Sequence, residues 1–372
     1  TYPEDVVMWP RIPIARPDIG EAERILVSRA VESGWISSKG PYVQQFEKEF
    51  AEYIGTQHGI ATNSGTSALH LALAALDVGH QSEVVVPSLT FVATANCARY
   101  LGAKTVFADS HPAYWCVDPR DIERKISKKT GAIMVVHLYG HPCDMDPIME
   151  IAKKRRIPII EDSAEAHGAE YKSRRVGSFG EIGCFSFYGN KIITTGEGGM
   201  CVTNDLKLAE KMRMLRQHGT DPQRPYWHNI VGFSYGMTNL QAAVGLAQLR
   251  RIGQLVETKR RIAGKYGKWL QESSEITHPP EMVWAKSVYW MYSILLKNER
   301  TRNDVMNSLH HKGIETRPFF HPIHKLPPYR TRNRCPVAES LSMRGVNLPS
   351  GPCITDHELR SVCSTVREAL PR

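Results

Sequence analysis

Features that mark several classes of protein are missing from this sequence of 372 residues. The longest apolar runs, such as Val84–Pro87 and Ile133–Val136, have the length of a strand, whereas a membrane-spanning helix needs about 20 apolar residues. Near Thr1, no basic stretch precedes an apolar core. Hydrophobic residues make up 42% of the chain and charged residues 23%, which excludes disorder and coiled coil as descriptions of the whole. We therefore expect neither a membrane protein nor a secretory signal peptide.

Cysteine pairs of the kind that bind zinc are also missing. The eight cysteines are scattered and none forms a Cys-x-x-Cys pair, which argues against structural zinc. Cys184 and Cys201 stand inside apolar, strand-like runs, so buried free thiols in a reducing compartment are the better interpretation. The sequence therefore predicts a cytoplasmic protein without a metal site.

Positive charge exceeds negative charge, but it is not gathered in one tail. The 47 lysines and arginines and the 38 aspartates and glutamates leave a net charge of +9. Basic runs at 153–156, 172–175, 250–251 and 259–261 are more typical of solvated faces than of specific sites. With no zinc-finger spacing and no RNA-binding signature, we expect no nucleic-acid partner. A cleft that captures a phosphorylated small molecule accounts for a part of the charge.

Short β-rich runs alternate with helical patterns through the first part of the chain. Strands are predicted at 84–86, 105–108, 133–137, 158–161, 184–187 and 200–203, and helices at 41–54, 68–76, 91–100, 147–155 and 206–216. This alternation indicates an α/β fold with a large mixed, mostly parallel sheet that is covered by helices on both faces. Such sheets bind their ligands at the carboxyl ends of the strands.

After Asn239 the pattern changes, which indicates a second domain. Residues 240–270 are predicted to form one or two long helices, with a weak break near Gly253. A smaller α+β unit follows, with a strand at 291–296 and a final helix from Asp356. We therefore divide the chain into a large domain, residues 1–250, and a small C-terminal domain, residues 251–372.

The first chemical signal is Ser64-Gly65-Thr66-Ser67, which follows a strand-like run and opens an apolar helix. Backbone N–H groups and hydroxyls at a helix N-terminus form an anion site, so this segment can bind a phosphate. Simple helix capping explains the same residues equally well.

Two more signals stand at the ends of buried strands. Asp162 ends a strongly apolar strand, where α/β folds place their chemistry, although a helix cap or an ion pair would use the same residue. Lys191 follows another buried strand and precedes the Gly-rich turn 196–199. An amine that is desolvated there has a lowered pKa and can attack a carbonyl, whereas most lysines are surface residues.

Together, the three signals match the needs of pyridoxal phosphate. The helix N-terminus would bind the phosphate, and Asp162 would keep the pyridine nitrogen protonated so that the ring accepts electrons. Lys191 would form the Schiff base with the cofactor's aldehyde.

Seven segments in order along the chain carry a family resemblance. They are Trp35–Ser37, Asn63–Ser67, Pro87–Phe91, His137–Gly140, Glu161–Gly168, Ser186–Gly199 and Met237–Asn239. In these segments the sequence resembles the sugar aminotransferases of the DegT/DnrJ/EryC1/StrS family, from about Ile12 to the C-terminus. The resemblance implies the aspartate-aminotransferase type of fold, pyridoxal 5'-phosphate as cofactor, and L-glutamate as amino donor, which leaves as 2-oxoglutarate.

Carried over position by position, the resemblance assigns cofactor contacts. Lys191 would hold the cofactor and later move protons, and Asp162 would pair with the pyridine nitrogen. Phe91 would stack on the ring, unless it is a core aromatic. Glu165 would lie near the ring hydroxyl, where many relatives carry Gln. The phosphate would be bound by Gly65, Thr66, Ser67 and Ser186.

The resemblance also implies a homodimer with shared active sites, in which Asn239 would reach the phosphate of the neighbouring subunit's cofactor. Trp35 and Ser37 are candidate substrate contacts, and His321 and His324 would lie near the sugar nucleotide. For either histidine, packing within a loop is an equal alternative.

One departure from the family pattern lies just before Asn239. Relatives commonly carry Asn at position 234 and Arg at position 236, where this chain has Ser234 and Gly236. With Gly236 this chain lacks the cation that relatives carry near the implied subunit interface. The departure puts a dimer contact or a substrate contact in doubt, but not the core chemistry.

The presence of Lys191 separates two reactions. Relatives that dehydrate the sugar at C3 carry His in its place, so transamination is favoured. A finer likeness to family members that form GDP-perosamine rests on 187–199, 231–233 and 317–329. We therefore expect conversion of GDP-4-keto-6-deoxy-D-mannose to GDP-perosamine, for a surface polysaccharide such as O-antigen or for an antibiotic sugar.

Other substrates and two non-catalytic functions stay open. A dTDP- or UDP-linked 4-keto sugar, or a GDP-linked 3-keto sugar, would meet the same Lys191. A cofactor-bearing regulator would need a DNA-binding module, and no segment is left unassigned for one. A protein that binds a sugar nucleotide without catalysing a reaction would keep its function without Lys191.

Overall fold

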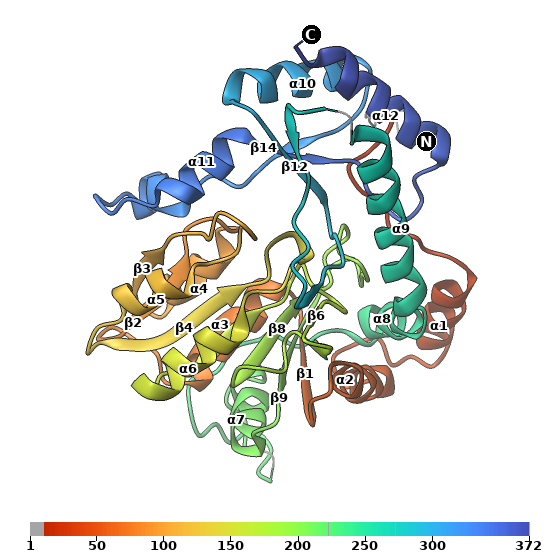
Figure 1. Ribbon diagram of the computed structural model, residues 1–372. Helices are drawn as coiled ribbons and strands as arrows, with labels where there is room; N and C mark the ends of the chain where they lie inside the picture. Colours follow the sequence, from red (N-terminus) through yellow and green to blue (C-terminus); the bar gives the residue numbers. More distant parts are fainter. Residues whose placement is uncertain (1–10, 222, 272, 372) are drawn as a thin grey trace.

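Seven short apolar strands form the central sheet of the computed structural model, which describes residues 11–221, 223–271 and 273–371 (Figure 1). Their order is β1 (His58–Thr62), β9 (Gly199–Thr203), β8 (Ile182–Ser186), β5 (Ile159–Asp162), β4 (Thr130–Val136), β2 (Glu83–Pro87) and β3 (Lys104–Ala108). The strands from β8 to β3 run parallel, whereas β9 is antiparallel to both of its neighbours. The predicted α/β class with a mixed, mostly parallel sheet is therefore confirmed.

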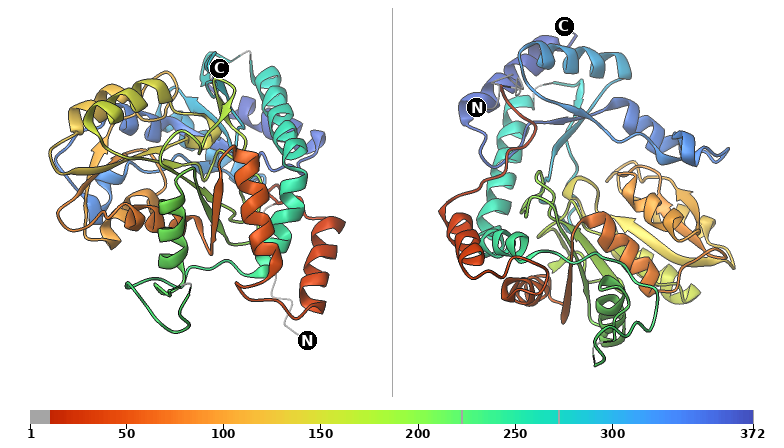
Figure 2. Two further views of the ribbon diagram at one scale, coloured as in Figure 1. Left: turned by 90° about the horizontal axis from the view of Figure 1, so that it is seen from below. Right: turned by 180° about the vertical axis from the view of Figure 1, so that it is seen from behind.

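Helices pack on both faces of this sheet (Figure 2). The helices of this part are α1 (Glu21–Glu32), α2 (Pro41–Ile54), α3 (Gly65–Ala75), α4 (Ala93–Tyr100), α5 (Pro119–Lys125), α6 (Met145–Arg155), α7 (Leu206–Arg216) and α8 (Asn239–Arg250), of which α8 packs on α2 and α1 packs on α8. On α2 the predicted apolar face buries Val43, Phe46 and Phe50. Helix α3 is apolar on nearly all sides because it packs against β8 and β9 and is covered by α4 and α7.

A second, smaller sheet lies above the first in Figure 1. Its strand order is β10 (Ile276–Thr277), β12 (Tyr292–Leu296), β14 (Gly345–Leu348) and β13 (Arg317–Pro318). The helices of this region are α9 (Ile252–Leu270), α10 (Glu299–His311), α11 (Pro336–Arg344) and α12 (Asp356–Ala369), with 3-10 turns η2 (Ile323–Lys325) and η3 (Pro327–Tyr329). This arrangement matches the α+β unit expected after the long helices.

The predicted domain boundary lies at the junction of two helices, since α8 ends at Arg250 and α9 begins at Ile252. The small unit's own core begins further along, at Ile262 of α9, and it also contains Ile12. A parallel bridge from Ile12 to Ile314 carries this early residue across the predicted boundary. The division at residue 250 stays a prediction.

The topology brings polar residues to one edge of the large sheet. Asp162 is the last residue of β5 and Ser186 is the last residue of β8, and these strands are parallel neighbours. A three-stranded sheet of β11 (Ala285–Lys286), β6 (Glu170–Tyr171) and β7 (Arg174–Arg175) lies nearby, with the turn η1 (Leu138–Gly140) after β4. Because parallel strands share their carboxyl ends, this edge is where a ligand is expected.

The cysteines agree with the sequence prediction. All eight are free, and seven of them are buried while Cys353 is half-buried. Within the described ranges, no helix has the length and apolar character needed to cross a membrane.

Candidate active site

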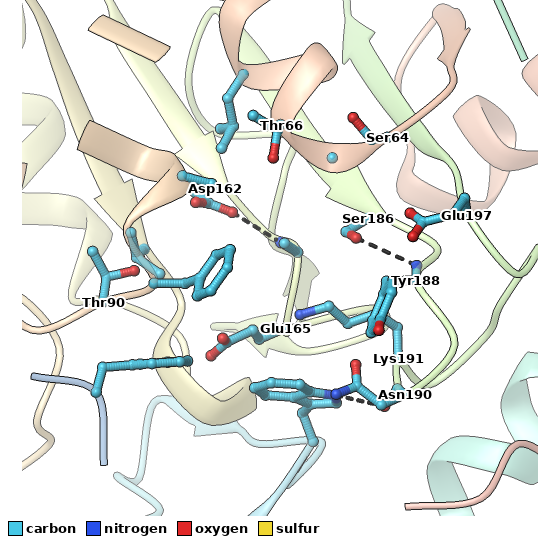
Figure 3. A pocket seen from close by; sticks show the side chains of 18 of the residues that line it. Ser64, Thr66, Thr90, Asp162, Glu165, Ser186, Tyr188, Asn190, Lys191 and Glu197 are labelled. Carbon is cyan, nitrogen blue, oxygen red and sulfur yellow. Dashed lines mark hydrogen bonds between the residues drawn. The ribbon is translucent and has the colours of Figure 1, made fainter. Parts of the chain in front are cut away.

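A pocket of about 370 Å³ opens at the carboxyl edge of the large sheet (Figure 3). Seven of the residues predicted from the sequence line it, although they come from distant parts of the chain: Gly65, Thr66, Phe91, Asp162, Glu165, Ser186 and Lys191. The pocket therefore brings together the helix N-terminus, the carboxylate at the strand end and the lysine. The sequence indicated these three groups separately.

The N-terminus of α3 forms one wall of the pocket. Ser64 caps the helix, and its hydroxyl accepts a hydrogen bond from the backbone N–H of Ser67 at 3.1 Å. A Cβ on Gly65 would lie 2.6 Å from the Cβ of Ser186, so only glycine allows the helix to start this close to the end of β8. The helix N-terminus and the Ser186 side chain thus meet in a polar cradle that suits a phosphate.

Asp162 also lines the pocket and is buried. One carboxylate oxygen accepts a hydrogen bond from Thr94 Oγ1 at 2.8 Å, and the other accepts one from the backbone N–H of Ala164 at 3.2 Å. Burial raises the pKa of Asp162, while these hydrogen bonds and the nearby Lys191 oppose the rise. Two fixed donors therefore aim a carboxylate into the pocket.

Lys191 enters the pocket from a tight turn after β8. Its backbone N–H donates to the carbonyl of Tyr188 at 2.9 Å, and its Nζ lies 3.9 Å from the centre of the Trp290 ring. The indole N–H of Trp290 donates to the carbonyl of Asn190 at 2.8 Å, which fixes the ring beside the lysine. Desolvation lowers the pKa of Lys191, an effect that the carboxylates of Glu165 and Asp162 partly offset. An amine of this kind is a competent nucleophile.

Glu165 is a second buried acid in the same pocket. Its Oε2 accepts a hydrogen bond from the backbone N–H of Tyr139 at 2.7 Å. Burial raises the pKa of Glu165 to about 7, although the Lys191 amine acts in the opposite direction. This carboxyl group therefore binds a proton more readily than an exposed glutamate does.

The residues present fit pyridoxal phosphate. The cradle at Gly65 would suit the phosphate, Lys191 would supply the amine for the aldehyde, and Asp162 would supply the carboxylate for the pyridine nitrogen. Phe91 is 55% exposed, lines the pocket and has its ring centre 5.9 Å from that of Phe320, so it is available to stack on a planar ligand rather than packed in the core.

Two predicted cofactor ligands have other contacts. The hydroxyl of Ser67 donates to Asn63 Oδ1 at 2.7 Å and also contacts Ser64 Oγ, so it serves the helix cap rather than the pocket. Asn239 is fully buried: its Oδ1 accepts from the backbone N–H of Tyr42 and its Nδ2 donates to the carbonyl of Trp35. Both ends of this carboxamide are engaged within the chain, so Asn239 holds residues 35–42 against α8. Its contact with the phosphate of a neighbouring subunit's cofactor stays a prediction.

The four predicted substrate contacts lie outside the pocket wall. His324 is a packed histidine, because its Nδ1 is bonded to Ser88 Oγ at 2.5 Å and its Nε2 to Glu339 at 3.1 Å. This is the structural alternative that the sequence left open for it. His321 is exposed, as are Trp35 and Ser37, whose carbonyls accept hydrogen bonds from Asn239.

Sequence reasoning missed several residues of the pocket. Trp290 carried no signal, because 99 positions separate it from Lys191 and no motif surrounds it. Arg317 and Phe320 belong to a segment that supported the finer family likeness, but only its histidines were named as substrate contacts. Glu197, in the Gly-rich turn, also lines the pocket. The small unit thus contributes Trp290, Arg317 and Phe320 to a site that the large sheet organises.

Comparison with known proteins gives matches over nearly the whole chain. Residues 17–367 match the model of the DegT/DnrJ/EryC1/StrS aminotransferase family. The chain is 45% identical to a GDP-perosamine synthase of Caulobacter vibrioides over 97% of this chain and 99% of the relative. It is also 45% identical to a GDP-perosamine synthase of Escherichia coli O157:H7, covering 96% of this chain and 98% of the relative.

A solved structure agrees with these matches. The aminotransferase TlmJ from Streptoalloteichus hindustanus superimposes with a TM-score of 0.93 at 31% identity, covering 96% of this chain and 98% of that one. With the family model, the relatives and the fold in agreement, this chain belongs to the DegT/DnrJ/EryC1/StrS aminotransferase family and is an enzyme of that class.

Proposed function

We propose that this aminotransferase transfers an amino group from L-glutamate to GDP-4-keto-6-deoxy-D-mannose and forms GDP-perosamine. The observation that carries the chemistry is one pocket that holds the Lys191 amine, the Asp162 carboxylate and the N-terminus of α3. The cofactor of this family is pyridoxal phosphate. The likeness to two GDP-perosamine synthases supports the choice of sugar nucleotide.

When bound, pyridoxal phosphate supplies an electron sink for the carbon that loses its proton. The N-terminus of α3, with Thr66 and Ser186, binds the phosphate and fixes the ring in the pocket. Asp162 would pair with the pyridine nitrogen and hold a proton there. Phe91 would pack on the ring and keep water away from it.

Lys191 performs the proton transfers. Its Nζ would act as the base that takes the α-proton of glutamate and as the acid that later returns that proton. Hydrolysis then releases 2-oxoglutarate, and the same movements in reverse order deliver the amino group to the keto sugar. Because a lowered pKa leaves the amine neutral more often, burial of Lys191 favours its action as a base.

A substrate panel tests the choice of sugar nucleotide. Purified protein with pyridoxal phosphate and glutamate is incubated with GDP-, dTDP- and UDP-linked keto sugars, and 2-oxoglutarate and amino sugar are quantified. We expect the highest kcat/KM with GDP-4-keto-6-deoxy-D-mannose and parallel double-reciprocal lines. No turnover of that sugar, with turnover of a dTDP- or UDP-linked one, would reject the proposed substrate and keep the aminotransferase.

We also propose a homodimer with shared active sites. Side chains from two segments are apolar and exposed: Trp35 and Ile36 in one, and Tyr226, Trp227 and Val231 in the other. Tyr226 is 94% exposed and Val231 is 92% exposed, which is unusual for a chain that stays monomeric. Asn239 donates a hydrogen bond to the carbonyl of Trp35 in the first segment. The backbone carbonyl of Tyr235, shortly after the second segment, accepts one from the N–H of Asn63 beside the pocket wall. A monomer mass in sedimentation equilibrium at micromolar concentration would contradict this proposal.

The eight free cysteines support a cytoplasmic location, since thiols persist where the compartment is reducing.

A further inference from the structure

A second cavity, of about 430 Å³, lies at the β3 edge of the large sheet. The large sheet and its helices contribute residues 104–107 of β3 and Arg99, in the last turn of α4, to this edge cavity. The small unit contributes residues 328–331 and Asn333, in a stretch that Figure 1 shows beside α11, above β3 and α4. None of the described residues that line the edge cavity also lines the active pocket, so the two cavities are separate.

Positive charge gathers around the edge cavity. Arg99, Lys104 and Arg330 line it, and two further arginines follow Arg330 at every second position of the exposed stretch. Lys104 pairs with Glu83 at 2.9 Å. Within the described ranges, no ion pair or side-chain hydrogen bond engages the guanidinium group of Arg99 or of Arg330. Two such groups on one cavity favour an anionic occupant.

The free edge of β3 adds backbone donors to the cavity. The carbonyl of Ala108 accepts a hydrogen bond from the N–H of Ser88 at 2.8 Å, so Ala108 turns its backbone groups toward β2. Because successive residues of a strand turn their backbone groups to opposite sides, Phe107 and Thr105 turn theirs toward the edge cavity. Phe107 is 2% exposed, and its N–H has no partner among the described residues. A buried N–H of this kind needs a bound group or a water molecule in the cavity as its acceptor.

The stretch of the small unit that carries Arg330 is held against the large sheet. The hydroxyl of Tyr329 donates to Asn96 Oδ1 at 2.5 Å, and its ring packs edge-on against that of Phe107, with 6.0 Å between the ring centres. The N–H of Thr331 donates to the carbonyl of His324 at 3.3 Å. Since these contacts fix the backbone on both sides of position 330, the cavity is formed before any ligand binds.

We propose that the edge cavity is a second binding site, for a ligand with two adjacent phosphate groups, such as a nucleoside diphosphate. A guanidinium group binds phosphate oxygens through two parallel hydrogen bonds, and Arg99 and Arg330 come from different units, so each can bind one phosphate. A single carboxylate would leave one of the two cations without a partner. The cavity volume suits a ligand of this size. This site uses no residue of the transamination chemistry and lies beyond the proposed function.

Calorimetric titration of the full-length enzyme, loaded with pyridoxal phosphate, tests the proposal with inorganic pyrophosphate as the probe. We expect saturable binding with one site per chain. The double variant Arg99→Gln/Arg330→Gln should raise the Kd at least about tenfold, because each lost hydrogen bond between charged groups weakens binding by about that factor. Parallel titrations with inorganic phosphate and GDP identify the source of the phosphates. Phosphate should bind more weakly than pyrophosphate, and a tighter binding of GDP that the double variant abolishes would assign the site to a nucleotide.

Two variants provide the comparison. Arg300→Gln removes an exposed arginine of α10 that does not line the cavity, and Arg317→Gln removes the arginine of the active pocket. Both should bind pyrophosphate as the wild type does. The proposal is overturned if the wild type shows no saturable binding, if the double variant keeps the wild-type Kd, or if Arg317→Gln alone abolishes binding. Binding of single-stranded RNA without binding of pyrophosphate or GDP would overturn it as well. None of these results affects the substrate panel, because the titrations need no keto sugar.

A second measurement locates the ligand without any variant. Modification of arginines in the wild type by phenylglyoxal is followed by peptide mass spectrometry, with and without pyrophosphate at about ten times its Kd. Modification of Arg99 and Arg330 should slow about tenfold, since only about a tenth of the sites are then free, whereas that of Arg300 should not change. Equal rates with and without pyrophosphate at Arg99 and Arg330 would contradict the proposal.

Discussion

Replacing Lys191 with alanine is expected to lower kcat for transamination by at least about 10³-fold, since general acid–base catalysis by a positioned side chain contributes up to about 10⁴-fold. Lys191 is the lysine that lines the same pocket as the cradle and Asp162 (Figure 3). The variant should also lose the visible absorbance that a lysine-bound cofactor gives. Steady-state kinetics and an absorption spectrum measure the two effects on one sample.

Controls separate this catalytic role from a structural one. Lys172→Ala removes an exposed lysine that pairs with Asp146, and it should keep the wild-type kcat. Added methylamine should restore part of the activity of Lys191→Ala, because a small base can enter the space left by the side chain. If Lys191→Ala folded normally by circular dichroism and kept more than about a tenth of the wild-type kcat, the assigned role would be wrong.

Replacing Asp162 with asparagine should lower kcat by about 10²- to 10³-fold, the cost of removing one preorganised electrostatic group. The change keeps the shape and one acceptor oxygen, which can still bind the Ala164 N–H, while it removes the negative charge and turns the group facing the Thr94 hydroxyl into a donor. Without that charge a proton on the pyridine nitrogen is less stable, and the cofactor accepts electrons less well. Kinetics of the glutamate half-reaction, followed spectroscopically in single turnovers, would measure this directly.

The expected effect lies in kcat rather than in folding. Thermal unfolding of Asp162→Asn should stay close to that of the wild type or rise, because burying a carboxylate is unfavourable. Asp146→Asn on the surface of α6 is the matched control and should change neither quantity. A normal kcat in Asp162→Asn would show that another group protonates the nitrogen.

Much of the fold followed from the sequence. Alternating strands and helices predicted the parallel sheet, and the helix at 41–54 has the bounds that were predicted from its apolar face. Helix α5 (Pro119–Lys125) was missed because seven residues are too few for a clear period. Helix α1 was missed because it exposes Ile25 and Val31, so its apolar pattern does not follow a buried face.

The site was predictable where the chain itself brings groups to the sheet edge. Asp162 and Ser186 end adjacent strands, and Gly65 opens a helix beside them, so local patterns sufficed. Contacts between distant segments were not predictable. Asn239 turned out to bind the backbone of Trp35 and Tyr42, which no local pattern indicates.

The histidines show the same limit. His324 differs from His321 only in its surroundings, since Ser88 and Glu339 enclose the first and leave the second exposed. The pocket wall formed by Trp290 and Phe320 likewise depends on how the small unit packs on the large sheet. Sequence spacing does not indicate such packing, because His324 and Ser88 are 236 positions apart and Trp290 lies 100 positions from the Asn190 carbonyl that it binds.

The account's central claim is that the pocket holds its cofactor on Lys191. Borohydride reduction of the full-length protein in the presence of pyridoxal phosphate, followed by peptide mapping, tests it most directly. We predict one phosphopyridoxyl group per chain, on Lys191. Labelling of a different lysine, or an unmodified Lys191 peptide under conditions in which the enzyme turns over, would contradict the account.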